Sequence, residues 1–165
     1  MTVADIVRTL DEQTELYGQL LETANEKTPV LVHNEVDKLN GILQKERKLI
    51  AKAEQLEQQR ILQTHRHFAS LGYISRMNTL RELIQSVHQP EMKQRLLEQQ
   101  QTLQGLLGEL RRSNELNQQL IQQSLAFINY SIDLVVDDPA EDMVYQHPQK
   151  SNGSGGRNGI FDTRA

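Results

Sequence analysis

The sequence predicts an all-α protein, an elongated antiparallel helical bundle or coiled coil of three to four helices. Its 165 residues include 23 leucines and 20 glutamines but only four prolines, a balance that favours helices. Aromatic residues make up only 4%, which is little bulk for the core of a compact globule. Helix breakers gather late, with four of the nine glycines between Gly153 and Gly159. We therefore predict a helical domain over 1–136 and a flexible tail over 137–165.

Composition excludes several classes of site and partner. The chain has no cysteine, so disulfides, thiol catalysis and iron–sulfur clusters are excluded. A formal net charge of -4 argues against general binding to nucleic acid or to an anionic membrane. No window approaches the roughly 18 apolar residues of a membrane span, and the first residues lack the pattern of a secretion signal. We expect a cytoplasmic protein without stable membrane insertion.

The first helix is predicted from an apolar seam, a series of residues spaced alternately by four and three positions. Thr2 with Asp5 three residues later forms a plausible amino-terminal cap. Pro29 is expected to end, kink or restart the helix because it lacks a backbone N–H. The seam contains Val3, Val7, Leu10, Thr14, Tyr17, Leu21 and Ala24, and Ile6, Leu16 and Leu20 widen it to the face of a bundle helix.

Two further helices are predicted before residue 90. Asn34 can cap a second helix that runs with a helical apolar period to Leu71, where Gly72 stops it. A short third helix is predicted from Ser75 to Val87.

The last helix is predicted to begin at Pro90, as its first residue, and to run to about Val136. Polar residues interrupt its seam, and two explanations stay open. Buried polar residues can fix helix register and partner choice, or a slight rotation of the helix can turn them to solvent. The predicted seam is Leu96, Leu103, Leu107, Leu110, Ile121, Ile128 and Val135, and the interrupting residues are Gln100, Asn114, Asn117 and Ser124.

No constellation of catalytic or metal-binding residues is found. None of the five histidines follows an acidic residue by three positions, as the di-iron sites of helical bundles require. The glycine-rich run after Asn152 lacks the strand, helix and Lys-Ser/Thr ending of a phosphate loop. We therefore expect neither an enzyme nor a cofactor or metal site.

The richest candidate for partner binding is the apolar stretch near the end of the last helix. Amphipathic helices bind one another through anchors spaced by three, four and seven positions. For most of these residues, packing of the last helix against the first two is the favoured alternative. The candidate residues are Leu116, Leu120, Ile121, Leu125, Phe127, Ile128 and Ile132.

Three segments resemble the FlgN family of flagellar type III export chaperones. The stretch from Ser113 to Leu134 is similar to the family's signature region, and the stretch from Asn34 to Ile50 is similar to its second-helix opening. The terminal residues Ile160 to Ala165 resemble a short motif of some members. In the first stretch the matching residues are Asn114, Asn117, Leu125, Phe127 and Ile128.

The resemblance implies a cytoplasmic chaperone that binds the carboxyl-terminal helical segments of hook-filament junction proteins, the first and third hook-associated proteins. Such a chaperone prevents premature polymerisation and delivers its clients to the cytoplasmic domain of the export gate. The seven candidate residues then bind the client. Tyr145 and Phe161 in the tail could dock on the gate or the client, or simply be solvated. The main alternative is a coiled-coil adaptor or homo-oligomeric structural scaffold.

Overall fold

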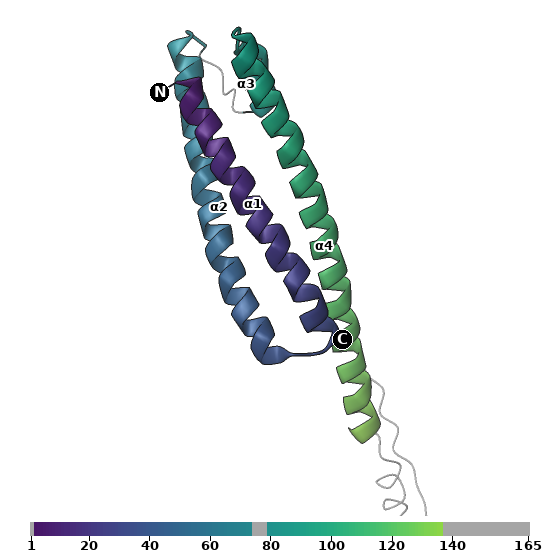
Figure 1. The fold of residues 1–165 in the computed structure, drawn as a ribbon. Coiled ribbons are helices and arrows are strands. Elements are labelled where there is room, and N and C mark those ends of the chain that lie inside the picture. The colour runs from purple at the N-terminus through teal and green to yellow at the C-terminus, as the bar shows by residue number, and fades with distance from the viewer. Residues whose placement is uncertain (1, 74–78, 137–165) are drawn as a thin grey trace, which may run out of the picture. The chain divides into compact units, whose positions relative to one another are not determined.

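The computed structural model describes residues 2–73 and 79–136, and these form four helices and no strand. The helices are α1 (Val3–Val32), α2 (Val36–Ser70), α3 (Leu80–Ser86) and α4 (Pro90–Val136), shown in Figure 1. The chain divides into two compact units, Met1–Phe127 and Ile128–Ala165. The predicted all-α class is confirmed, and the tail from residue 137 lies outside the described residues.

The start of helix α1 agrees with the prediction, and its continuation past Pro29 does not. At the start, the backbone N–H of Thr2 donates to Asp5 Oδ2 at 2.8 Å, which confirms the predicted cap. Pro29 lies inside the helix, which extends to Val32, so the expectation of an end or restart at this proline is wrong. Proline removes one backbone hydrogen bond, and the turns on either side keep theirs. Leu31, which is buried, adds packing to that last turn.

The connection between α1 and α2 corrects the predicted cap of the second helix. Asn34 has φ 54°, in the left-handed region that asparagine tolerates, and therefore forms the turn and not the cap. The N-cap is Glu35, which makes no capping hydrogen bond through its side chain. The other end agrees with expectation, because α2 stops at Ser70 and Gly72 follows with φ 81°.

The third helix is shorter than predicted. Thr79 is extended and caps α3, accepting a hydrogen bond from the backbone N–H of Glu82 at 3.2 Å. The helix begins at Leu80, where the Thr79–Glu82 capping box is a strong start signal, and the predicted start at Ser75 lies outside the described residues. Val87 ends the helix in an extended conformation, and Pro90 opens α4 as predicted.

Helix α1 is the central element of the first unit. Thr9 bonds Gln63, Gln13 bonds Glu57 and Lys27 bonds Glu46, so α1 and α2 are antiparallel. Contacts between α1 and α4 rise together in residue number on both helices, so this pair is parallel, as Figure 1 shows. The predicted antiparallel bundle is confirmed, because α2 runs opposite to both α1 and α4, and the first and third long helices of such an arrangement are parallel to each other.

Two apolar clusters hold the first unit together. One joins α1, α3 and α4, and its most deeply buried members, Leu83 and Leu96, each contribute about 1.5–3 kcal/mol by leaving water. The other joins α1 to α2, with Leu110 of α4 packed against it. The predicted α1 seam is confirmed, because Leu10 and Ala24 are buried and its other members are half-buried. The first cluster is Ile6, Leu10, Leu83, Ile84, Val87, Leu96 and Leu103, and the second is Leu16, Leu20, Ala53 and Leu56.

Candidate partner-binding surface

One stripe of α4 packs toward α1, and it differs from the predicted seam. A series of buried and half-buried residues of the helix is spaced alternately by four and three, and we call it the α1-facing stripe. Four members of the predicted seam are exposed, so the prediction is wrong at these positions. They are Leu107, Ile121, Ile128 and Val135. The stripe consists of Met92, Leu96, Gln99, Leu103, Leu106, Leu110, Ser113, Asn117, Leu120 and Ser124.

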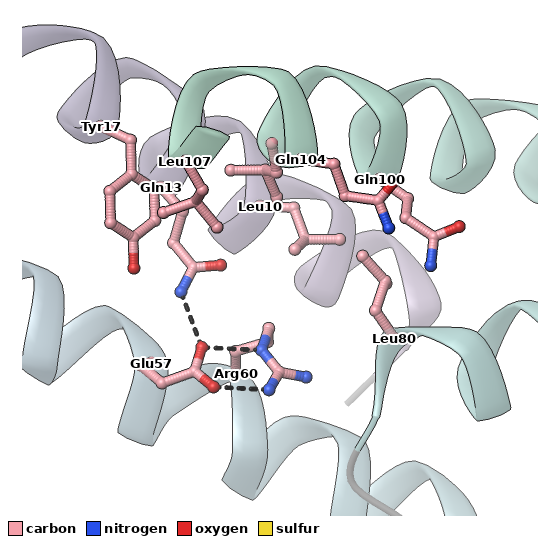
Figure 2. Close-up of a pocket in the computed structure, with 10 residues that line it drawn as sticks. Leu10, Gln13, Tyr17, Glu57, Arg60, Leu80, Gln100, Gln104 and Leu107 are labelled. Atoms are coloured by element: carbon pink, nitrogen blue, oxygen red, sulfur yellow. Dashed lines mark hydrogen bonds and ion pairs between the residues drawn. The ribbon is translucent and has the colours of Figure 1, made fainter. Parts of the chain in front are cut away.

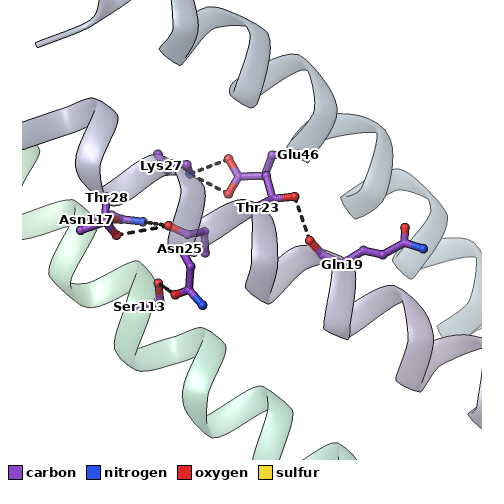
Figure 3. Close-up of polar contacts among 9 residues, drawn as sticks. Gln19, Thr23, Asn25, Lys27, Thr28, Glu46, Ser113 and Asn117 are labelled. Carbon is purple, nitrogen blue, oxygen red and sulfur yellow. Dashed lines mark hydrogen bonds and ion pairs between the residues drawn. The ribbon is translucent and has the colours of Figure 1, made fainter. Parts of the chain in front are cut away.

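Polar side chains in this stripe are hydrogen-bonded to α1, as Figure 3 shows for Asn117 and Ser113. Asn117 is only 2% exposed, and its Nδ2 donates to the carbonyl oxygen of Ala24 at 2.8 Å. Ser113 Oγ donates to Asn25 Oδ1 at 2.9 Å. These bonds fix the rotation of α4 on α1.

Both explanations for the polar interruptions therefore apply, to different residues. Asn117 is buried and bonded, whereas Asn114 turns to solvent. Gln100 and Ser124 are half-buried. Sequence reasoning missed Gln99, which is buried and donates to Val7 O at 2.9 Å and to Asp11 Oδ1 at 2.8 Å. The signal that could have identified Gln99 is its position in the four-three pattern, three residues after Leu96 and four before Leu103.

The rotation set by the stripe exposes most of the candidate binding residues. Within the first unit, Ile121 is 40% and Leu125 55% exposed, and Leu116 and Phe127 are exposed as well. Leu120 alone of the five is half-buried, as a member of the α1-facing stripe. The favoured alternative, in which most of these residues pack α4 on α1 and α2, is therefore wrong for the other four.

The remaining candidate residues belong to the second unit. Ile128 is 50% and Ile132 53% exposed. Along the sequence of α4, they continue the four-three spacing that begins at Ile121 and Leu125. We call Ile121, Leu125, Ile128 and Ile132 the isoleucine face. Its spacing is that of a coiled-coil seam, displaced by one residue from the α1-facing stripe.

Tyr145 and Phe161, the predicted docking residues of the tail, lie outside the described residues. Their role stays a prediction. Removal of residues 137–165, followed by measurement of both client binding and export, tests it, because a solvated tail would leave both unchanged.

A hollow of about 310 Å³ lies where α1, α2, α3 and α4 meet, and Figure 2 shows its lining. Its apolar lining residues include Leu10 and Leu107. Arg60 Nη2 donates to Glu57 Oε1 at 2.6 Å, and Gln13 Nε2 donates to Oε2 at 3.0 Å. The hydrogen bonds from Arg60 hold the pKa of Glu57 below its ordinary value, and burial raises the pKa of Tyr17. Because its carboxylate is already bonded to Arg60 and Gln13, Glu57 is suited to holding helices together and not to proton transfer.

The described residues contain no group of three or more metal-ligating side chains close enough to hold an ion. Over the same part of the chain, no helix has the length and apolar content to cross a bilayer. Within the first unit, the exposed apolar side chains of α4 include Leu116, Ile121, Leu125 and Phe127.

Comparison with known proteins agrees with a helical chaperone. The model of the FlgN protein family matches residues 1–153. The uncharacterized protein YvyG of Bacillus subtilis (strain 168) is 35% identical over 136 residues, which cover 82% of this chain and 82% of that protein. No solved structure matches the chain. With the match extending over nearly the whole sequence, the chain belongs to the FlgN family, the family of flagellar export chaperones.

Proposed function

We propose that this chaperone binds the carboxyl-terminal helical segments of the first and third hook-associated proteins in the cytoplasm. It prevents their premature polymerisation and delivers them to the cytoplasmic domain of the export gate. The observation that carries this proposal is the isoleucine face, four aliphatic residues at coiled-coil spacing that are 40–55% exposed.

The chemistry of this face matches an amphipathic helix as partner. Burying a fully exposed leucine or isoleucine contributes about 1.5–3 kcal/mol, so covering four half-exposed ones supplies several kcal/mol. Charged side chains are scarce here, because Glu115 and Asp133 are the only ones from residue 113 to residue 136. An apolar seam with few charges favours a partner that is itself apolar on one side.

The same geometry explains how binding prevents polymerisation. A subunit whose terminal helix assembles with its neighbours exposes an apolar stripe before assembly, and such a stripe promotes aggregation. A chaperone helix that covers the stripe occupies the surface needed for assembly. Release at the gate then requires only that a helix-on-helix contact be exchanged.

Sedimentation of the full chain with a purified hook-associated protein tests the proposal. We expect a one-to-one complex with the intact client and none with a client that lacks its carboxyl-terminal helical segment. The proposal would be contradicted if both forms of the client bound with equal affinity, or if neither form bound. A stable homodimer that ignores the client would instead support the structural scaffold.

A further inference from the structure

The positions on either side of the isoleucine face carry uncharged side chains. In a coiled coil, two positions of each seven-residue repeat flank the apolar seam, and charged residues there commonly pair with the partner helix. Along the sequence of α4, the positions that flank the isoleucine face are Gln122, Ser124, Asn129 and Ser131. Gln122 and Asn129 are exposed, and both serines are half-buried. A helix that packs on this face therefore meets amides and hydroxyls along its edges.

The helix contacts inside the first unit are bordered differently. Between α1 and α2, Lys27 pairs with Glu46 at 2.6 Å. Between α1 and α4, Arg95 pairs with Asp11 at 3.0 Å. Ion pairs of this kind help to fix which helices pack together and in which register. The uncharged border is thus a property of the isoleucine face and not of every helix contact in the chain.

The density of charge along α4 falls where the isoleucine face begins. Residues 90–112 include seven charged side chains, whereas residues 113–136 include two, Glu115 and Asp133. Glu115 accepts a hydrogen bond from Arg111 Nε at 3.1 Å and is therefore already neutralised within the helix. Asp133 is not at a position that flanks the seam. Neither acidic residue therefore offers a charge to a partner at the edges of the face.

An uncharged border limits which partner helix binds well. A charged residue of the partner placed against an amide or a hydroxyl loses water and gains no opposite charge, so it opposes binding. A glutamine, asparagine or serine of the partner can both donate and accept hydrogen bonds at these edges. Flanking positions without charge also impose no charge pattern that would separate one partner helix from another.

We infer that the isoleucine face receives an amphipathic client helix whose own flanking positions are uncharged, so that binding is nearly independent of salt. The apolar stripe of the client covers the four seam residues, and amides or hydroxyls line its edges. Because no charge selects the partner, one face can accept two clients of different sequence. The inference rests on the proposed function and adds the chemistry of the client's edges.

The salt dependence of binding is the first test. The full chain is titrated with a purified hook-associated protein in about 0.05 M and about 0.5 M sodium chloride, a range over which exposed ion pairs become strongly screened. The dissociation constant is expected to change by less than about twofold. A loss of affinity of about tenfold or more at the higher salt concentration would overturn the inference.

Two double variants of opposite charge form the second test. Gln122→Glu with Asn129→Glu adds two negative charges at one edge of the face, and Gln122→Lys with Asn129→Lys adds two positive charges at the same positions. Both should weaken binding by about twofold to fivefold, and to a similar extent, because either charge meets an uncharged edge. If one variant bound at least about tenfold more tightly than the other, the client's edge would be charged and the inference would be overturned.

Gln119→Lys with Gln123→Lys is the matched control, because both glutamines lie on the side of α4 away from the seam. With helicity unchanged by circular dichroism, this variant should bind like the wild type. An equal loss of affinity in the control would show a general effect of charge and overturn the inference. If binding depends strongly on salt but Leu125→Asp with Ile128→Asp still abolishes it, the inference fails and the proposed function survives. Failure of the wild-type chain to bind would overturn both.

Discussion

The hydroxyl of Thr28 donates a hydrogen bond of 2.6 Å to Oδ1 of Asn117, 89 residues further along the chain. The amide of Asn117 donates in turn to the carbonyl of Ala24, so its side chain bonds two residues of one α1 turn. Buried polar pairs in a helical seam are satisfied in one register only. This pair therefore fixes which residues of α4 turn toward α1 and which turn to solvent.

Asn117→Ala should destabilise the chain by about 1–3 kcal/mol, because it removes both hydrogen bonds and leaves a void in the stripe. Urea denaturation followed by circular dichroism measures the loss. The control is Asn114→Ala, since Asn114 is an exposed asparagine on the same helix, and it should change stability by less than about 0.5 kcal/mol. Equal effects of the two variants would show that Asn117 does not hold the register.

Lys27 and Glu46 form an ion pair between α1 and α2 at 2.6 Å, with side chains only 9% and 16% exposed. Lys27→Met should cost about 2–4 kcal/mol, because the carboxylate of Glu46 is left without its cation. Adding Glu46→Leu should recover most of the loss. Lys45→Met is the control. Lys45 pairs with Glu26 at 3.5 Å across the same two helices, but both side chains are about half exposed. Loss of this exposed ion pair should lower the free energy of unfolding by less than about 1 kcal/mol.

Glu57 should make the folded state sensitive to acid. Its pKa is lowered, chiefly by hydrogen bonds from Arg60, so its stabilisation is complete above the ordinary value of 4.5 and is lost as pH falls through the folded-state pKa. The melting temperature of Glu57→Gln should lie below that of the wild type near pH 7 and approach it near pH 3. Glu54→Gln, at an exposed position of the same helix, should follow the wild type at both pH values.

Local signals in the sequence predicted most of the fold. Helix ends were predicted correctly at three places. Thr2 and Asp5 form the cap of α1, Gly72 follows α2 with a positive φ, and Pro90 is the first residue of α4. The prediction for Asn34 is wrong because asparagine favours both helix caps and left-handed turns, and only the turn between α1 and α2 decides between the two roles.

The orientation of α4 could not be predicted in the same way. Its sequence contains two possible seams one residue apart, one rich in isoleucine and one with Gln99, Ser113 and Asn117. Hydrophobicity favours the first seam, and the structure buries the second within the first unit. The deciding contacts come from Val7, Asn25 and Thr28, which are about 90 residues away in sequence. The candidate binding residues were identified, but their exposure followed only from these contacts.

The exposed isoleucine face is tested most directly by titration calorimetry of a hook-associated protein against three forms of the full chain. The three forms are the wild type and two double variants. The first double variant, Leu125→Asp with Ile128→Asp, places two negative charges on the isoleucine face. The second, Gln119→Asp with Gln123→Asp, places the same charge on the opposite side of α4. With helicity unchanged in both variants, the first should lose at least about tenfold in affinity and the second should bind like the wild type. Equal affinity in all three forms would contradict the account.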